Sequence, residues 1–191
     1  LSELDDGECQ VACPAGLVGL AVHPACGLLL LVPVAQRCGQ AVGLGEYTGV
    51  GFPGEGVGKL PTYRTWRSAE TAALSYGYGV STTALQLAQA YAVIANDGVK
   101  VPLTLKKVDG VPQGEQVIGK ATARQLVQML ETVVSRVGTA RRAQVPGYQV
   151  AGKTGTGHKG VAGGYADDSY IGLFAGLAPA TDPRIVTVVV I

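Results

Sequence analysis

Four consecutive residues near the carboxyl end of the chain, Lys153-Thr154-Gly155-Thr156, combine a cation, two hydroxyls and a glycine. An ammonium and hydroxyl donors suit the recognition of a carboxylate, because they form charge-assisted hydrogen bonds with it. Gly155 lets a strand approach a ligand without a Cβ in the way. A backbone N–H of such a strand can also point at the oxyanion of an acyl transfer, a contact worth about 3 kcal/mol in the transition state. The residues therefore predict acyl-transfer chemistry, provided that their surroundings are those of a strand beside a cleft.

The segments around this motif predict an antiparallel sheet. Three of them have the composition of strands: residues 148–156, 170–177 and 184–191. A glycine-rich loop is expected at 157–168, and a turn with two prolines at 179–183 joins the last two strands as a hairpin. Residues 186–191 are apolar on both faces, which is typical of a central strand and not of an edge.

A first helix is predicted to begin at a capping box, Thr83-Ala84-Leu85-Gln86, and to end at Asn96-Asp97-Gly98. Its apolar side chains fall on one stripe: Leu87, Tyr91 and Ile94. Residues 99–108 have strand-like residues interrupted by Pro102, so they are at most an edge strand.

A second helix is predicted to begin at another capping box, Thr122-Ala123-Arg124-Gln125, and to end at Gly138. Its apolar stripe is expected to be core: Leu126, Met129, Leu130, Val133 and Val137. Helices and strands together predict an α+β or α/β fold, in which helices pack on an antiparallel sheet.

The composition agrees with one folded domain or a large piece of one. The chain has 191 residues, of which 47% are hydrophobic and 15% charged, and its net charge is +1. A nucleic-acid-binding surface would need clustered basic residues, so the balance gives no support to a nucleic-acid partner.

The chain divides near Val42 into residues 1–42, which are anomalous, and residues 43–191. The first segment holds all the cysteines, and it has no sustained helical or strand period. Residues 11–35 are long enough for a membrane span but contain three prolines, and the acidic start does not suit a secretory signal. A zinc site is a further alternative, although the spacing of its ligands is irregular: Cys9, Cys13, His23 and Cys26. We favour a shifted reading frame, a disordered segment or the edge of a fragment.

Residues 44–191 resemble the C-terminal part of the transpeptidase domain of class B penicillin-binding proteins. The division-specific type, penicillin-binding protein 3 of Gram-negative bacteria, matches best. The matching stretches follow in order along the chain: LGEYTG at 44–49, GFPGE at 51–55, SYGYG at 75–79, LQLAQAYA at 85–92, GKTGT at 152–156 and LFAGLAP at 173–179. The lysine-threonine-glycine triplet stands on a strand of the sheet in these proteins and in β-lactamases.

The resemblance implies a partial β-lactamase-like fold and a serine peptidoglycan D,D-transpeptidase that cross-links the septal cell wall and is acylated by β-lactams. It implies that Lys153, Thr154, Gly155 and Thr156 bind the substrate carboxylate and that the backbone N–H of Thr156 helps to form the oxyanion hole. Tyr76 and Tyr78 would line the cleft, or else be core aromatics. The family also implies stem peptides, β-lactams and division-machinery membrane proteins as partners, no cofactor or metal, and a periplasmic domain anchored in the inner membrane.

Two motifs that the family needs are missing from the sequence. None of the serines has a lysine three positions on, as in S-x-x-K, or an asparagine two positions on, as in S-x-N. The first motif should lie upstream of residue 1, and the second should lie within residues 1–42, so a frame shift near Val42 would explain its loss. Without the nucleophile, the chain alone is not expected to form an acyl-enzyme.

Two kinds of alternative remain on the sequence: another serine acyl enzyme or a non-catalytic protein. A D,D-carboxypeptidase or a β-lactamase would share the fold, and a non-catalytic β-lactam sensor or a vestigial protein would share much of the sequence.

Overall fold

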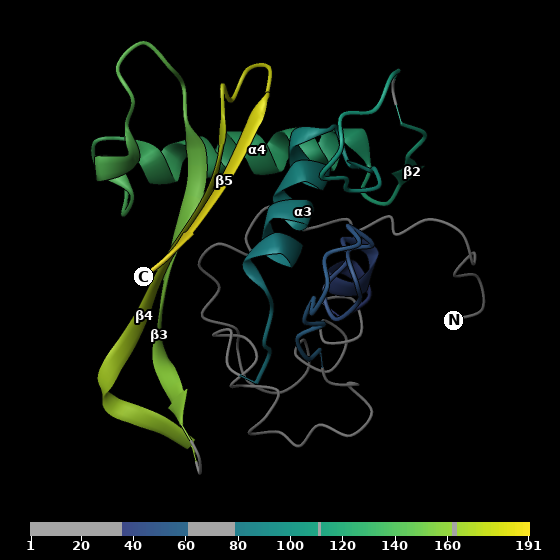
Figure 1. Ribbon diagram of the computed structural model, residues 1–191. Helices are drawn as coiled ribbons and strands as arrows, with labels where there is room; N and C mark the ends of the chain where they lie inside the picture. The colour runs from purple at the N-terminus through teal and green to yellow at the C-terminus, as the bar shows by residue number, and fades with distance from the viewer. Residues whose placement is uncertain (1–35, 61–78, 111, 162–163) are drawn as a thin grey trace, which may run out of the picture.

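The computed structural model describes residues 36–60, 79–110, 112–161 and 164–191. Two helices, α3 and α4, pack beside an antiparallel sheet of three strands, β3, β4 and β5, while a two-stranded pair, β1 and β2, lies at the far side of the helices (Figure 1). This arrangement confirms the predicted α+β class.

Helix α3 (Ala84–Ala95) begins where the sequence predicts. Thr83 is its N-cap: the Thr83 side chain accepts a hydrogen bond from the Gln86 N–H, and the Gln86 side chain accepts one from the Thr83 N–H. The helix ends at the C-cap Asn96, and Asp97 follows with a φ of 53°. This left-handed backbone conformation is one that Asp tolerates better than most residues.

Helix α4 (Lys120–Val134) begins and ends earlier than predicted. Its N-cap is Gly119, which has no side chain to cap with, so the predicted capping box at Thr122 is wrong. Contacts with another part of the chain accompany the early start, because Lys120 forms a 2.9 Å ion pair with Asp97 at the end of α3. The predicted end at Gly138 is also wrong, and Val137 is 98% exposed because it lies beyond the last helical turn.

The three strands of the sheet are antiparallel neighbours in the order β3 (Ala151–Val161), β4 (Gly164–Ala178) and β5 (Ile185–Val190). The expected glycine-rich loop at 157–168 is wrong, because β3 and β4 continue through it as a long hairpin. The His158 ring packs against the Tyr170 ring, with centroids 4.5 Å apart, and its Nδ1 lies 2.8 Å from the Ala166 carbonyl oxygen. These contacts support pairing where glycines alone would favour a loop.

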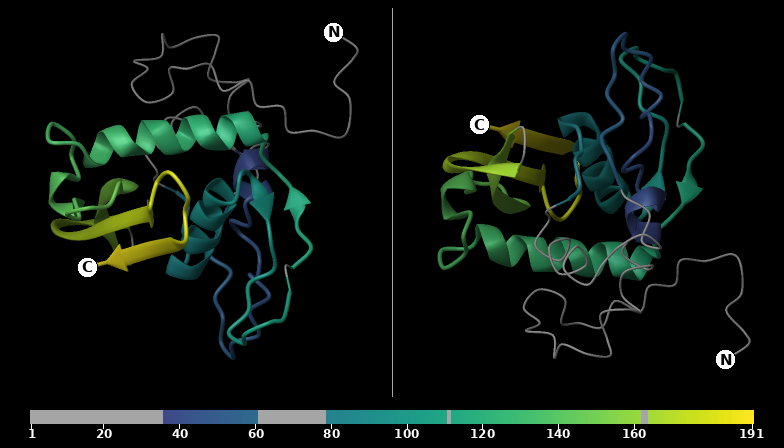
Figure 2. Two further views of the ribbon diagram at one scale, coloured as in Figure 1. Left: turned by 90° about the horizontal axis from the view of Figure 1, so that it is seen from above. Right: turned by 90° about the horizontal axis from the view of Figure 1, so that it is seen from below.

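Both helices pack on one face of the sheet. The core cluster joins Val127 of α4 to Ala151 of β3 and Leu177 of β4, and side chains of α3 complete it, among them Tyr91 and Ile94. Figure 2 shows α3 and α4 on the same side of the strands when the molecule is seen from above and from below. In the described part of the chain, no helix covers the opposite face.

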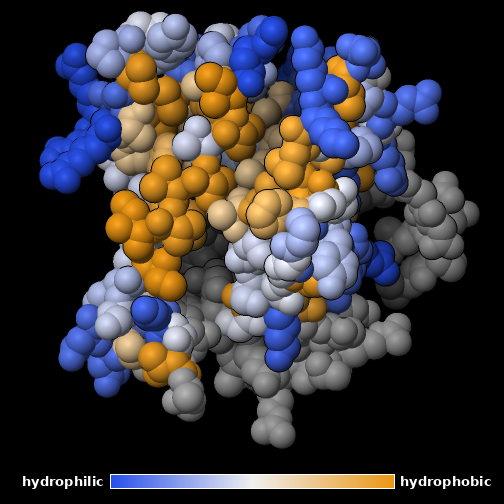
Figure 3. Space-filling model, in the orientation of Figure 1, coloured by the Kyte–Doolittle hydropathy of each residue, from blue (hydrophilic) through white to orange (hydrophobic). Residues whose placement is uncertain are grey.

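Strand β5 is an edge strand in the described sheet, so its predicted central position is wrong there. Its composition is nevertheless apolar on both faces, and Ile185, Val189 and Val190 are exposed. The side of the molecule that carries β5 shows a broad apolar area in Figure 3. A strand with the composition of a central strand therefore stands at an open edge.

Beyond the helices, residues 36–41 are helical, although the sequence indicated no helix before residue 42. Strand β1 (Val99–Lys100) pairs with β2 (Glu115–Gln116), so the edge strand considered at 99–108 is limited to its first two residues. Among the residues that the structure describes, no helix is long and apolar enough to cross a membrane. The alternatives for residues 1–35, including the zinc ligands, lie outside the described residues.

Candidate active site

The hydrogen bonds between β4 and β5 determine which way the backbone of β4 points. Gly172 N donates to Ile191 O over 3.0 Å, and Ile191 N donates to Gly172 O over 2.9 Å. In an antiparallel strand, the N–H and C=O of one residue point to the same side, and successive residues alternate. Even-numbered residues of β4 therefore bond to β5, and odd-numbered ones bond to β3.

The same alternation places the backbone of the motif at the free edge of β3. The odd residues of β4 lie opposite Lys153 and Gly155, with the pairs Lys153↔Ala175 and Gly155↔Leu173. The N–H and C=O groups of Thr154 and Thr156 then point away from β4, to an edge that has no partner strand in the described sheet. A backbone N–H at Thr156 is thus directed outward, as an oxyanion contact from the strand requires.

The side chains of the motif alternate between the two faces of the sheet. Lys153 lies on the face that α3 and α4 cover, since it shares that face with the core residue Ala151. Thr154 and Thr156 are on the opposite face. The motif therefore does not present its ammonium and its hydroxyls on one face, and what these residues share is the free edge.

Two hydrogen bonds hold the motif in place. Lys153 is exposed, and its Nζ donates to the Thr154 carbonyl oxygen over 2.8 Å, so the ammonium lies along the free edge. The hydroxyl oxygen of Thr154 lies 3.2 Å from that of Thr139, which follows the end of α4. Thr156 is exposed and its side chain has no such contact in the described residues.

Gly155 packs closely against the neighbouring strand. A Cβ at this position would come within 3.0 Å of the Leu173 side chain, which lies directly opposite on β4. A glycine is therefore favoured here by the packing of the helix-covered face, independently of any ligand at the edge.

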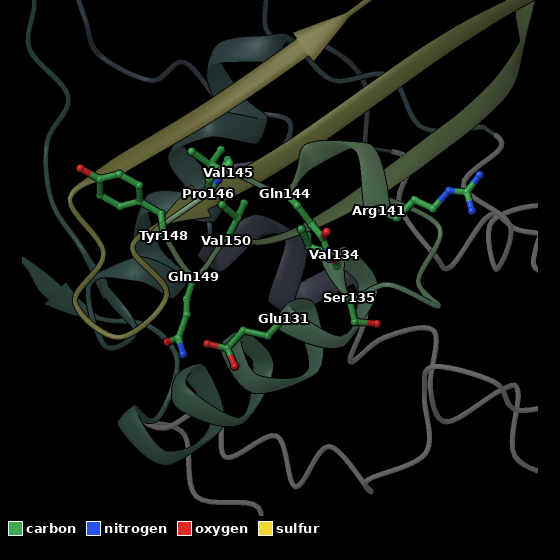
Figure 4. Close-up of a pocket in the computed structure, with 10 residues that line it drawn as sticks. All are labelled: Glu131, Val134, Ser135, Arg141, Gln144, Val145, Pro146, Tyr148, Gln149 and Val150. Atoms are coloured by element: carbon green, nitrogen blue, oxygen red, sulfur yellow. The ribbon is translucent and has the colours of Figure 1, made fainter.

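A cavity of about 580 Å³ lies between the end of α4, the 3₁₀ helix η2 (Arg141–Ala143) and the segment before β3 (Figure 4). Glu131 and Gln149 lie close together in this view, while Tyr148 and Arg141 point away from the other lining side chains. Lys153, Thr154 and Thr156 are not among its lining residues. The cavity is therefore separate from the free edge of β3.

Tyr76 and Tyr78 lie outside the described residues, so the structure does not place them relative to Lys153. Within the described ranges, no group of three or more His, Cys, Asp or Glu side chains could hold a metal ion. The sequence indicates Gln86 only as part of a capping box. Its further hydrogen bonds cannot be predicted from local sequence, because they reach residues 29 and 40 positions away.

The sequence model of the penicillin-binding protein transpeptidase domain matches residues 35–191. The chain belongs to this family. A probable peptidoglycan D,D-transpeptidase PbpC of Pseudomonas aeruginosa is 45% identical over 159 residues, which are 83% of this chain and 28% of that protein. The peptidoglycan D,D-transpeptidase FtsI of Escherichia coli is 42% identical over 149 residues, which are 78% of this chain and 25% of the relative.

Solved structures agree with the family. The transpeptidase domain of Burkholderia pseudomallei penicillin-binding protein 3 superposes with a TM-score of 0.77 at 42% identity, over 86% of this chain and 52% of that one. Penicillin-binding protein 3 of Mycobacterium tuberculosis, solved in complex with aztreonam, gives a TM-score of 0.75 at 37% identity, over 86% of this chain and 42% of the other. The chain thus spans about half of the solved domain and about a quarter of the curated relatives.

Proposed function

We propose that this chain forms the C-terminal part of a peptidoglycan D,D-transpeptidase and supplies the strand that binds the substrate at its active site. Lys153 offers the cation for the terminal carboxylate of a stem peptide. The backbone N–H of Thr156 offers a donor to the oxyanion. The serine nucleophile is not in this chain, so acyl transfer needs the upstream part of the domain.

The outward direction of the Thr156 backbone is the observation that carries the proposal. It places a donor at the one edge of β3 that is open in the described sheet, next to the Lys153 ammonium. The names of two relatives as D,D-transpeptidases support the same chemistry, and the aztreonam complex of the similar Mycobacterium tuberculosis protein supports a β-lactam as a second ligand. Thr154, Gly155, Tyr76 and Tyr78 complete the proposed binding set.

A chimera tests the proposal. Residues 43–191 are joined behind the upstream part of the Burkholderia pseudomallei transpeptidase domain, at the point where the match to this chain begins. We expect a fluorescent penicillin to label the chimera covalently and to leave the 191-residue chain unlabelled. A control chimera with its upstream nucleophilic serine changed to alanine should also remain unlabelled. A folded chimera without label, or a labelled 191-residue chain, would contradict the proposal.

The reaction product distinguishes a transpeptidase from the hydrolytic alternatives. A transpeptidase transfers the acyl group from a D-alanyl-D-alanine donor to an added amine, whereas a carboxypeptidase or β-lactamase transfers it to water. We expect the chimera to form the amide product and to release D-alanine in equal amount. Release of D-alanine without amide product would favour the hydrolase.

We further propose that the complete protein acts in septal cross-linking during cell division, with its catalytic domain in the periplasm and an anchor in the inner membrane. The similarity to FtsI supports this role. Division-machinery membrane proteins would then be its partners. Localisation of a fluorescent fusion to the full gene product at division sites tests this, and a uniform envelope signal would speak against it.

A further inference from the structure

The Gln86 side chain is fully buried, with 0% exposure, and both ends of its amide are occupied. Its Nε2 donates to the carbonyl oxygens of Glu46 (2.6 Å) and Val57 (2.8 Å). Its Oε1 accepts from the backbone N–H of Thr83 (3.0 Å) and the hydroxyl of Thr82 (3.1 Å). A carboxamide has two N–H donors and two lone pairs, so its hydrogen-bonding capacity is used in full.

These bonds join the two ends of a glycine-rich loop to the start of α3. Glu46 and Val57 lie at the beginning and the end of that loop. Directly after it, Lys59 and Ser81 exchange backbone hydrogen bonds of 2.7 and 3.0 Å. At Gly58, which has a φ of 65°, a Cβ would lie 2.3 Å from the Ser81 carbonyl oxygen and 3.1 Å from the Gln86 Oε1. Three chain segments therefore meet around one amide: Glu46, residues 57–59 and residues 81–86.

Helix α3 connects this amide to the sheet. Further along the same helix, Tyr91 and Ile94 pack against the core cluster that contains Ala151 of β3. Lys153 follows two residues later on the same strand. A helix is a stiff element, so the position of the loop and of the Lys59–Ser81 pair relative to β3 is set at Gln86.

We propose that Gln86 is a positioning residue of the transpeptidase site: its amide holds the 46–57 loop and the paired residues Lys59 and Ser81 at a fixed place relative to the strand that carries Lys153. The inference rests on the proposed function. It concerns geometry and not contact with substrate.

Gln89, one turn further along α3, provides a matched comparison. It is also buried, with 4% exposure, but its Oε1 has no hydrogen-bond partner among the described residues. Gln86→Met and Gln89→Met each replace a buried side-chain amide by an apolar side chain of similar volume. They differ in the hydrogen bonds that are lost.

The first experiment uses the 191-residue chain and measures amide hydrogen exchange. In Gln86→Met, we expect exchange at the hydrogen-bonded amides of Thr48, Glu55 and Lys59 to accelerate by about tenfold or more, because the buried hydrogen bonds that hold the loop are lost. Exchange in α4 should stay unchanged, and Gln89→Met should leave the loop protected. Equal acceleration in both variants would overturn the proposal.

Gln86→Glu adds a pH readout. The ionised carboxylate has no donor and faces two carbonyl oxygens, whereas the protonated acid regains one O–H donor. Burial raises the pKa of a carboxyl group. Relative to the parent chain at each pH, loop exchange should therefore be fastest at pH 8 and slow down by pH 5. A pH-independent effect would contradict the assigned hydrogen bonds.

The second experiment measures acylation by the fluorescent penicillin in the chimera, at a temperature where circular dichroism shows that all variants are folded. We expect Gln86→Met to lower the acylation rate constant by about tenfold or more and Gln89→Met to change it less than about twofold. Equal loss in both variants means that Gln86 acts through stability alone and overturns its positioning role. An unlabelled parent chimera with a loosened loop in Gln86→Met overturns the proposed function, and the positioning role with it, but leaves the hydrogen-bond assignment standing.

Discussion

Lys153 is the side chain whose replacement tests the site most directly. Charge-assisted hydrogen bonds contribute about 1.5–3 kcal/mol, so Lys153→Ala should lower the second-order acylation rate of the chimera by about 10- to 150-fold. Lys159, an exposed lysine further along β3, is the matched control, and Lys159→Ala should leave the rate unchanged. Equal losses in the two variants would indicate a general electrostatic effect and not recognition at Lys153.

Asp97 links the end of α3 to the start of α4. Its hydrogen bond from Arg124, and then that from Lys120, lower the pKa of the Asp97 carboxyl from 3.8 to about 2. A folded-state pKa below the unfolded one means that the ionised form stabilises the fold above about pH 4. That contribution disappears as the pH falls from about 4 to about 2.

Asp97→Asn checks this pH dependence, because Asn also tolerates the positive φ of residue 97. We expect the Tm of the parent to exceed that of the variant above pH 4, with the difference shrinking toward pH 2 and in 1 M salt. Asp182→Asn, at an exposed 3.4 Å pair, serves as the control and should change Tm little. A difference that is undiminished at pH 2 would exclude the carboxylate as its cause.

At the scale of single residues, the sequence predicted the identity of the motif but not the direction of its side chains. Strand alternation separates Lys153 from Thr154 and Thr156, and a residue list cannot show which face helices cover. The hydrogen bonds of Gln86 cannot be predicted from the sequence for a different reason. Its capping box is local and visible, whereas its bonds to Glu46 and Val57 depend on tertiary folding.

Gly152 allows a test of how closely β3 packs against β4. A Cβ at Gly152 would lie 2.6 Å from the Phe174 ring and 2.7 Å from the Ala175 carbonyl oxygen, which belongs to the neighbouring strand. Overpacking of this kind costs about 1–3 kcal/mol, so Gly152→Ala should lower Tm by about 3–10 °C. Thermal unfolding followed by circular dichroism measures the shift.

Gly157 is the control on the same strand, because a Cβ there would meet nothing within 4 Å. Gly157→Ala should leave Tm within about 1 °C of the parent value, since surface changes of this kind are worth about 0.5 kcal/mol or less. Equal destabilisation by both substitutions would mean that backbone freedom, and not contact with Phe174, makes glycine favourable on β3.

At the scale of elements, local signals were reliable where nothing distant competed with them. The capping box of α3 and the turn between β4 and β5 are as predicted, because both depend on neighbouring residues. The start of α4 differs from the prediction because Lys120 and Arg124 pair with Asp97, which directly follows the C-cap of α3. The glycine-rich hairpin was missed because cross-strand pairing outweighs the low strand propensity of glycine.

At the scale of the whole molecule, β5 lies at an open edge of the described sheet, although its composition is that of a central strand. By the alternation established for β4, the N–H and C=O groups of Val186, Val188 and Val190 point to that edge. Its sequence has no charge or proline to oppose pairing with another chain. An uncharged, exposed edge of β-branched residues is a site of edge-to-edge aggregation.

We therefore expect the isolated chain to associate at micromolar concentration and Val189→Lys to reduce that association. Val189 is 43% exposed, so a lysine there can reach water while placing a charge beside the edge. Val137→Lys adds the same charge at a residue that is 98% exposed and lies outside the strands of the sheet, and it should not reduce association. Sedimentation velocity of the three proteins at equal concentrations measures the effect. If both lysines reduce association equally, net charge explains the result, and the open edge of β5 is not where the chains meet.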